Sequence, residues 1–92
     1  MLLQRALANG EAALTAEVMP PRGGDPSRSL EAAGALRGWV HAVNVTDGSR
    51  AVMRMSSLAL CRLLLDVGIE PVLQLACRDR NRIALQAELL GA

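Results

Sequence analysis

The chain has 92 residues, a net charge of +1 and one aromatic residue, Trp39, so it forms at most one small domain. Its near-neutral charge provides no general attraction to nucleic acid or to an anionic membrane, and its lack of Phe and Tyr disfavours base stacking. No apolar run reaches the roughly 18 residues that span a bilayer, and the interrupted apolar run at the N-terminus does not fit a signal peptide. We therefore expect a cytoplasmic location.

The first half of the chain alternates between helical and extended patterns. Residues 2–8 are expected to form a short amphipathic helix that ends at Asn9-Gly10. A first strand is predicted at about 14–19, and the proline- and glycine-rich stretch 20–27 must be a loop. A helix then extends to about Arg37.

The second half repeats this order twice. A valine-rich strand is predicted at 40–46, and Ser49 is expected to cap a long helix that continues to Val67. A third strand at 71–77 precedes a helix over about 81–90. The sequence therefore predicts one leading helix followed by three strand–loop–helix units.

This order predicts an α/β fold with a parallel sheet. Each unit has about 27 residues, close to the roughly 30 of one unit in a (β/α)8 barrel. We therefore predict the first three βα units of a (β/α)8 TIM barrel, with helix 2–8 covering the barrel bottom. A doubly wound sheet is the alternative. Because three parallel strands leave two open edges, residues 1–92 are expected to be a single partial domain that further sequence or a partner completes.

Each predicted strand has one apolar face and one face with a polar residue near its carboxyl end. These polar residues are Glu17, Asn44 with Thr46, and Gln74. In a parallel barrel they converge at the mouth, where active sites lie. A carboxylate there is partly desolvated, which favours its protonated form and suits Glu17 to general acid catalysis. The alternative is a structural ion pair between Glu17 and an arginine from elsewhere in the barrel.

Other polar groups allow two interpretations each. The stretch "TDGSR" at 46–50 could bind an anion with backbone amides, or could be a turn and helix cap. The stretch "CRDRNR" at 77–82 could be a salt-bridge network or could face an anionic ligand. Cys61 and Cys77 lack metal-ligand spacing, so no metal site is predicted, and both are expected to be buried and reduced.

Three segments of the sequence resemble the methylenetetrahydrofolate reductase family. They are "LTAEVMPPRG", "VNVTDGSR" and "PVLQLACRDRNRIALQAELLGA", and the resemblance extends from about Leu14 to Ala92. It is strongest to the shorter, MetF-like members and to the reductase half of bacterial fusions with homocysteine methyltransferase. The resemblance implies a flavin-bearing (β/α)8 barrel that reduces 5,10-methylenetetrahydrofolate to 5-methyltetrahydrofolate in one-carbon metabolism.

The resemblance also implies roles for individual residues. Glu17 matches the glutamate of the family's E-x-x-P-P motif, the general acid that protonates N10 of the folate. Thr46 matches a threonine beside the flavin and the nicotinamide, and Asp47 and Ser49 occupy positions that contact the flavin. Gln74 stands where many members have a flavin-contacting histidine. Asp47 departs from the aromatic residue of several members, and a carboxylate near flavin phosphates is unfavourable.

The implied cofactor is FAD, with FMN as the alternative, and the implied electron donor is NAD(P)H. The expected partners are the folate substrate and either a second copy of the chain or a separate subunit, with no nucleic acid and no membrane. The family's fourth strand ends in a glycine–aspartate motif that nothing here matches, so we expect these 92 residues to be inactive alone. Two rival functions stay open, a non-catalytic assembly module and a folate- or pterin-binding barrel without redox chemistry.

Overall fold

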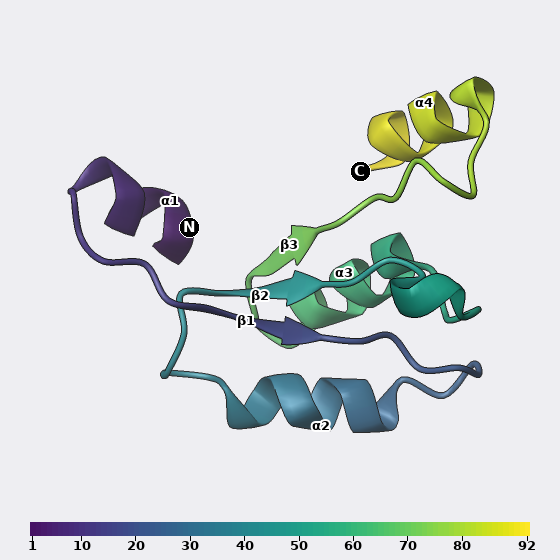
Figure 1. Ribbon diagram of the computed structural model, residues 1–92. Coiled ribbons are helices and arrows are strands. Elements are labelled where there is room, and N and C mark those ends of the chain that lie inside the picture. The colour runs from purple at the N-terminus through teal and green to yellow at the C-terminus, as the bar shows by residue number, and fades with distance from the viewer.

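Three short parallel strands form the centre of the computed structural model, which describes residues 1–92 (Figure 1). They are β1 (Thr15–Val18), β2 (Ala42–Val45) and β3 (Pro71–Leu73), and they lie in the order β1-β2-β3. In this register Glu17 lies opposite Asn44, and Asn44 lies opposite Val72. The predicted α/β class and parallel sheet are confirmed. The sheet is open, because β1 and β3 each have one edge without a neighbouring strand.

Four α-helices and one short 3-10 helix connect and flank the strands. Their bounds are α1 (Leu2–Ala8), α2 (Ser27–Ala35), η1 (Ser49–Ala51), α3 (Ser57–Asp66) and α4 (Arg82–Gly91). After each of the first two strands, a helical connection brings the chain back to the amino end of the sheet before the next strand begins. All three strands therefore have their carboxyl ends on one side (Figure 1). No helix is both long and apolar enough to cross a bilayer.

Helices α2 and α3 pack on one face of the sheet and form the core with it. The core consists of apolar side chains from β1, β2, α2, α3 and the approach to β3, namely Val18, Ala33, Val43, Val45, Leu60, Cys61, Leu64 and Ile69. Burying each large aliphatic side chain contributes about 1.5–3 kcal/mol to stability. The apolar strand faces therefore point toward the helices, as the alternation of Val43 and Val45 predicts.

The opposite face of the sheet carries polar side chains. Thr15 and Glu17 are exposed and Asn44 is half-buried. The Asn44 side-chain amide donates a hydrogen bond to Thr15 Oγ1 at 3.0 Å, which links β1 to β2 on this face. We refer to it below as the helix-free face, since α2 and α3 both pack on the other one.

Helix α1 has the predicted bounds and lies toward the amino ends of the strands (Figure 1). The Glu70 carboxylate, just before β3, accepts hydrogen bonds from the backbone N–H groups of Leu2 at 2.6 Å and Leu3 at 3.4 Å. A carboxylate at this end of a helix satisfies free N–H groups and interacts favourably with the helix dipole. This contact fixes α1 at the end of the sheet opposite the βα loops.

The third strand is shorter than the predicted range 71–77. Beyond Leu73 the Gln74 N–H still donates to the carbonyl of Val45 in β2, but the next backbone groups bind side chains. The carbonyl of Gln74 accepts a hydrogen bond from Ser57 Oγ at 2.9 Å, and the N–H of Ala76 donates to Asp47 Oδ2 at 2.7 Å. Strands one and two are likewise trimmed at both ends, to 15–18 and 42–45.

The predicted long helix from Ser49 to Val67 is wrong. Ser49 begins only the 3-10 turn η1, and α3 starts at Ser57. Arg50 and Ala51 have φ of 61° and 59°, which end helical geometry, and the N–H of Met55 donates to the carbonyl of Pro21 at 2.7 Å. The segment between η1 and α3 is thus tied to the loop after β1.

Helix α3 packs on the sheet through one stripe of buried residues. Its buried residues are Ser57, Leu60, Cys61 and Leu64, which follow helical spacing, whereas the neighbouring Leu65 is 49% exposed. Gly68 ends this helical segment as expected, because its φ of 76° is favourable only for glycine. Cys77 is exposed, contrary to prediction, since the chain leaves the sheet after β3.

Candidate functional site

Thr46 follows directly after β2, at the carboxyl end of the sheet. Its N–H donates to the carbonyl of Val18 at 3.3 Å, so the ladder between β1 and β2 continues to this residue. The residue is only 8% exposed, and Thr46 Oγ1 is buried without a hydrogen-bond partner. A buried hydroxyl without a partner is unfavourable, so this position suits a ligand that supplies one.

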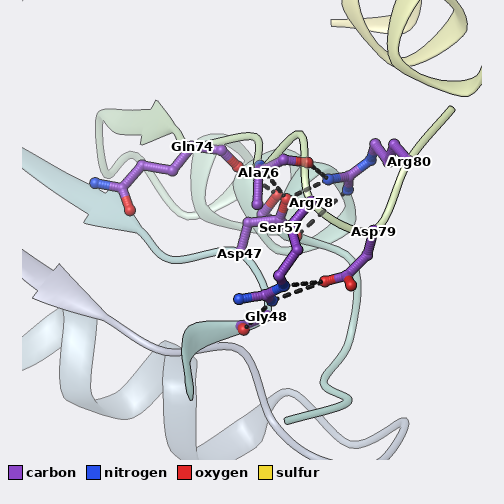
Figure 2. Close-up of polar contacts among 8 residues, drawn as sticks. All are labelled: Asp47, Gly48, Ser57, Gln74, Ala76, Arg78, Asp79 and Arg80. Atoms are coloured by element: carbon purple, nitrogen blue, oxygen red, sulfur yellow. Dashed lines mark hydrogen bonds and ion pairs between the residues drawn. The ribbon is translucent and has the colours of Figure 1, made fainter. Parts of the chain in front are cut away.

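Gln74 occupies the equivalent place after β3. Its N–H donates to the carbonyl of Val45 at 3.3 Å, which places it beside the end of β2. Figure 2 shows its side chain extending away from Asp47 and the arginines, and no protein group binds the side-chain amide. The amide is therefore free to donate and accept hydrogen bonds.

Asp47, next to Thr46, is held by the loop that follows β3 (Figure 2). Asp47 Oδ2 accepts hydrogen bonds from the Ala76 N–H at 2.7 Å and from Arg80 Nη1, and Oδ1 accepts from Arg80 Nη2 at 3.3 Å. The side chains of Asp47 and Arg80 are 13% and 17% exposed. The hydrogen bond from Arg80 lowers the pKa of Asp47, so the pair is ionised and its charges cancel.

The second arginine of this loop binds the same turn. Arg78 Nη2 donates to the carbonyl of Gly48 at 3.0 Å and pairs with Asp79 at 2.7 Å (Figure 2). The hydrogen bond from Arg78 lowers the pKa of Asp79. For Arg78 and Arg80, the salt-bridge interpretation of the 77–82 stretch is therefore confirmed. Arg82 lies in the first turn of α4, is exposed and takes part in no ion pair.

The partner of Asp47 was missing from the sequence prediction, which left the 77–82 stretch open between a salt-bridge network and contact with an anionic ligand. Loops that follow adjacent parallel strands meet at one edge of a sheet, so the order of the strands was the signal for this contact. All the hydrogen bonds that the Asp47 carboxylate accepts come from Ala76 and Arg80 of the same chain.

The 46–50 stretch is a turn and not the start of an α-helix. Gly48 has φ of 56°, a left-handed conformation that favours glycine at this position. Ser49 makes no side-chain cap hydrogen bond, contrary to the predicted cap. An anion site at a helix N-terminus is therefore not formed here.

Glu17 is exposed on the helix-free face and forms no ion pair. The partial desolvation predicted for its carboxylate is absent from this chain, because no further strands cover that face. Glu17 lines a depression of about 450 Å³ together with Met19, Arg22, Ser49, Arg50, Val52 and Arg54. A second depression of about 450 Å³ on the side of α2 also contains Glu17, Arg22 and Arg54, with Arg28 in addition.

The predicted site residues thus fall into four groups. Glu17 and Ser49 line one depression, Thr46 presents a free buried hydroxyl at the adjacent strand end, and Asp47 is bound to Arg80. Gln74 extends away from the Asp47 group. The sequence prediction also missed the arginines around Glu17, although the chain has no lysine and ten arginines.

A flavin fits some of these residues and not others. Thr46 Oγ1, the Ser49 hydroxyl and the Gln74 amide have hydrogen-bonding capacity that the chain leaves unused. Asp47 does not fit as a direct contact, because both its oxygens are bound by Arg80 and Ala76. The same pairing removes the charge conflict that a free carboxylate would create with flavin phosphates. No three His, Cys, Asp or Glu side chains are grouped as a metal site.

Comparison with known proteins identifies one family. Residues 2–92 match the family model described as Methylenetetrahydrofolate reductase. Neither a search of curated proteins nor a search of solved structures gives a significant match.

Proposed function

The chain belongs to the methylenetetrahydrofolate reductase family, and from this premise we propose that it takes part in the reduction of 5,10-methylenetetrahydrofolate to 5-methyltetrahydrofolate. The observation that carries this proposal is the position of Glu17. Its carboxylate lies on the helix-free face, near the carboxyl end of β1, in a depression shared with Ser49. A proton donor for the folate is expected at the carboxyl ends of the strands, where parallel barrels have their active sites.

Completion of the sheet is part of the proposal. Both outer strands have an open edge, and Thr15, Glu17 and Asn44 make the helix-free face polar. Further strand–helix units would close the sheet into a (β/α)8 barrel, and this face would become the barrel interior. Closure would also remove the open edges, which are prone to aggregate. The 92-residue chain by itself is expected to lack turnover.

In the completed barrel, Glu17 acts as the general acid. Its carboxyl group donates a proton to N10 of the folate, which opens the five-membered ring and leaves an iminium at N5. Burial by the added strands favours the protonated acid that this step needs. A bound flavin, reduced by NAD(P)H, would supply the hydride that the one-carbon unit receives.

Three other residues are proposed to hold the flavin. The Thr46 hydroxyl is buried without a partner, and Ser49 and Gln74 offer unused polar groups at neighbouring strand ends. Asp47 is proposed to act indirectly, because its bonds to Ala76 and Arg80 hold the loop after β3 against the turn that contains Ser49. FAD is the proposed form, with FMN as the alternative.

The substitution Glu17→Gln tests the acid role in the completed, flavin-loaded protein. We expect the rate of folate reduction to fall by about 10²–10⁴-fold, the usual contribution of a general acid, while flavin reduction by NAD(P)H keeps its rate. Glu11→Gln is the matched control, because Glu11 is an exposed glutamate outside the sheet. Equal loss of both half-reactions in Glu17→Gln would contradict the assignment.

The open edges of β1 and β3 favour one rival, a non-catalytic assembly module that pairs with another subunit. Size-exclusion chromatography with absorbance detection separates the two proposals. A stable stoichiometric complex without a flavin absorption band supports the module, whereas a visible absorption band of bound flavin supports the reductase. Folate binding without any flavin band supports a folate or pterin barrel without redox chemistry.

A further inference from the structure

The depression that contains Glu17 has an unusual charge balance. Its other charged residues, Arg22, Arg50 and Arg54, are all arginines, and they come from the loop after β1 and from the segment around η1. The only acidic residue there is Glu17. A concave surface with one dominant sign of charge concentrates the electrostatic potential and attracts ions of opposite sign.

These arginines differ from others in the chain. Arg62, Arg78 and Arg80 each pair with an aspartate, while Arg22, Arg50 and Arg54 form no ion pair, even though Glu17 lines the same depression. Arg22 and Arg50 are exposed, so their guanidinium groups are free to receive a ligand. Two independent chain segments therefore bring unpaired charges to one place.

Arg54 is the fixed member of this group. Arg54 Nη1 donates to the carbonyl of Pro20 at 3.0 Å, which holds the side chain against the loop after β1. Arg54 Nε is buried and has no hydrogen-bond partner. Arg50 is held at φ of 61° and ψ of 24°, an unfavourable conformation for a residue other than glycine.

We infer that Arg22, Arg50 and Arg54 form an anion subsite for a ligand with closely spaced carboxylates or phosphates. The planar guanidinium fork binds both groups through paired hydrogen bonds. That the other end of this ligand reaches Glu17 rests on the proposed function, whereas anion binding by the three arginines does not. Two sources share this chemistry, the glutamyl carboxylates of a folate and the diphosphate of a dinucleotide.

The test uses the 92-residue chain with 15N-labelled arginine, followed by NMR of the side-chain Nε–H groups. The probes are γ-linked triglutamate and inorganic pyrophosphate, each titrated without flavin or folate. We expect the signals of Arg22, Arg50 and Arg54 to shift and saturate with one dissociation constant, while those of Arg5 and Arg82 stay in place. Tighter binding of triglutamate assigns the subsite to a glutamyl tail, and tighter binding of pyrophosphate assigns it to a dinucleotide.

A pair of variants separates a built subsite from general charge attraction. R22Q/R50Q changes two exposed arginines of the depression, and R5Q/R82Q removes the same charge from exposed arginines elsewhere. We expect R22Q/R50Q to weaken binding about tenfold or more and the control to change it less than about twofold. Equal weakening by both variants, or uniform shifts of all arginines, overturns the subsite.

The result is independent of the reductase proposal, because no readout involves flavin or turnover. If the completed protein lacks reductase activity while the arginine signals still saturate, the subsite holds and the proposed reaction fails. If the enzyme is active and neither probe shifts Arg22, Arg50 and Arg54, the subsite fails and the proposed reaction holds.

Discussion

The carboxylate of Asp47, in the turn after β2, is bound by the guanidinium of Arg80, which lies 33 residues later in the loop after β3. Arg80 Nη1 also donates to the carbonyl of Ala76 at 2.9 Å, so the pair fixes the backbone of its own loop. The contact joins two βα loops beyond the point where the strands stop pairing. Thr46 and Gln74, whose N–H groups bind the carbonyls of Val18 and Val45, lie at this same carboxyl end of the sheet.

Removing either member of the Asp47–Arg80 pair should destabilise the fold. Because the pair is mostly buried, Asp47→Asn and Arg80→Gln should each lower the free energy of unfolding by about 2 kcal/mol. The double variant should lose less than the sum of both, with a coupling of about 1 kcal/mol or more in urea denaturation. The exposed Arg62–Asp66 pair is the control and should couple by at most about 0.5 kcal/mol. Equal coupling in the two pairs would contradict this ranking.

The same pair should make stability depend on pH. Its hydrogen bond with Arg80 lowers the pKa of Asp47 below the ordinary value of 3.8, so the carboxylate stabilises the folded state above that value. This stabilisation is lost as the pH falls through the folded-state pKa, where Asp47 takes up a proton. Between pH 6 and pH 2, the melting temperature should therefore fall less steeply for Asp47→Asn than for the parent chain. Asp79→Asn should leave the acid slope nearly unchanged, because Asp79 is exposed to solvent.

Replacing Ala51 by glycine should stabilise the folded chain. Its φ of 59° is strained for any residue with a Cβ atom, and its side chain is exposed. Ala51→Gly should raise the free energy of unfolding by about 0.5–1 kcal/mol, since relief of strain exceeds the added entropy of the unfolded chain. Ala32→Gly, at an exposed position within α2, should instead lower it by about 1 kcal/mol. Destabilisation by both substitutions would show that residue 51 does not hold a left-handed conformation in solution.

The two neighbouring leucines of α3, Leu64 and Leu65, should differ sharply in how much each contributes to stability. Leu64 is 0% exposed and Leu65 is 49% exposed. Leu64→Ala should cost about 2–5 kcal/mol through lost burial and a residual cavity, whereas Leu65→Ala should cost less than about 1 kcal/mol. Both losses are measured from the shift of the urea midpoint, with the m-value expected to stay unchanged. A larger loss of stability in Leu65→Ala than in Leu64→Ala would indicate that the other face of α3 packs on the sheet.

The two cysteines should react with a thiol reagent at different rates. Cys77 is exposed, while Cys61 lies in the core, where burial raises the pKa of its thiol. Ellman's reagent should label one thiol quickly in the native chain and the second only as the chain unfolds. In Cys77→Ser the fast phase should disappear. Two fast thiols would indicate that α3 does not stay packed on the sheet.

The amino-acid sequence by itself determined the order of the elements and the two faces of the sheet. Alternation in β2 places Val43 and Val45 in the core and Asn44 on the polar face, and this pattern depends only on the geometry of a strand. Strands that alternate with helices also require a parallel sheet, so the topology followed from local patterns. Glu17 was assigned to its face by the same reasoning.

Only the tertiary structure decided where helix α3 begins, how soon β3 ends, and which partner Asp47 has. The bond from Met55 to Pro21, the bond from Ala76 to Asp47, and the Asp47–Arg80 pair all join segments about 30 residues apart. Strand alternation and helix propensity act over a few neighbouring residues, so they contain no information on such contacts. These contacts form only after the sheet has brought its carboxyl-end loops together.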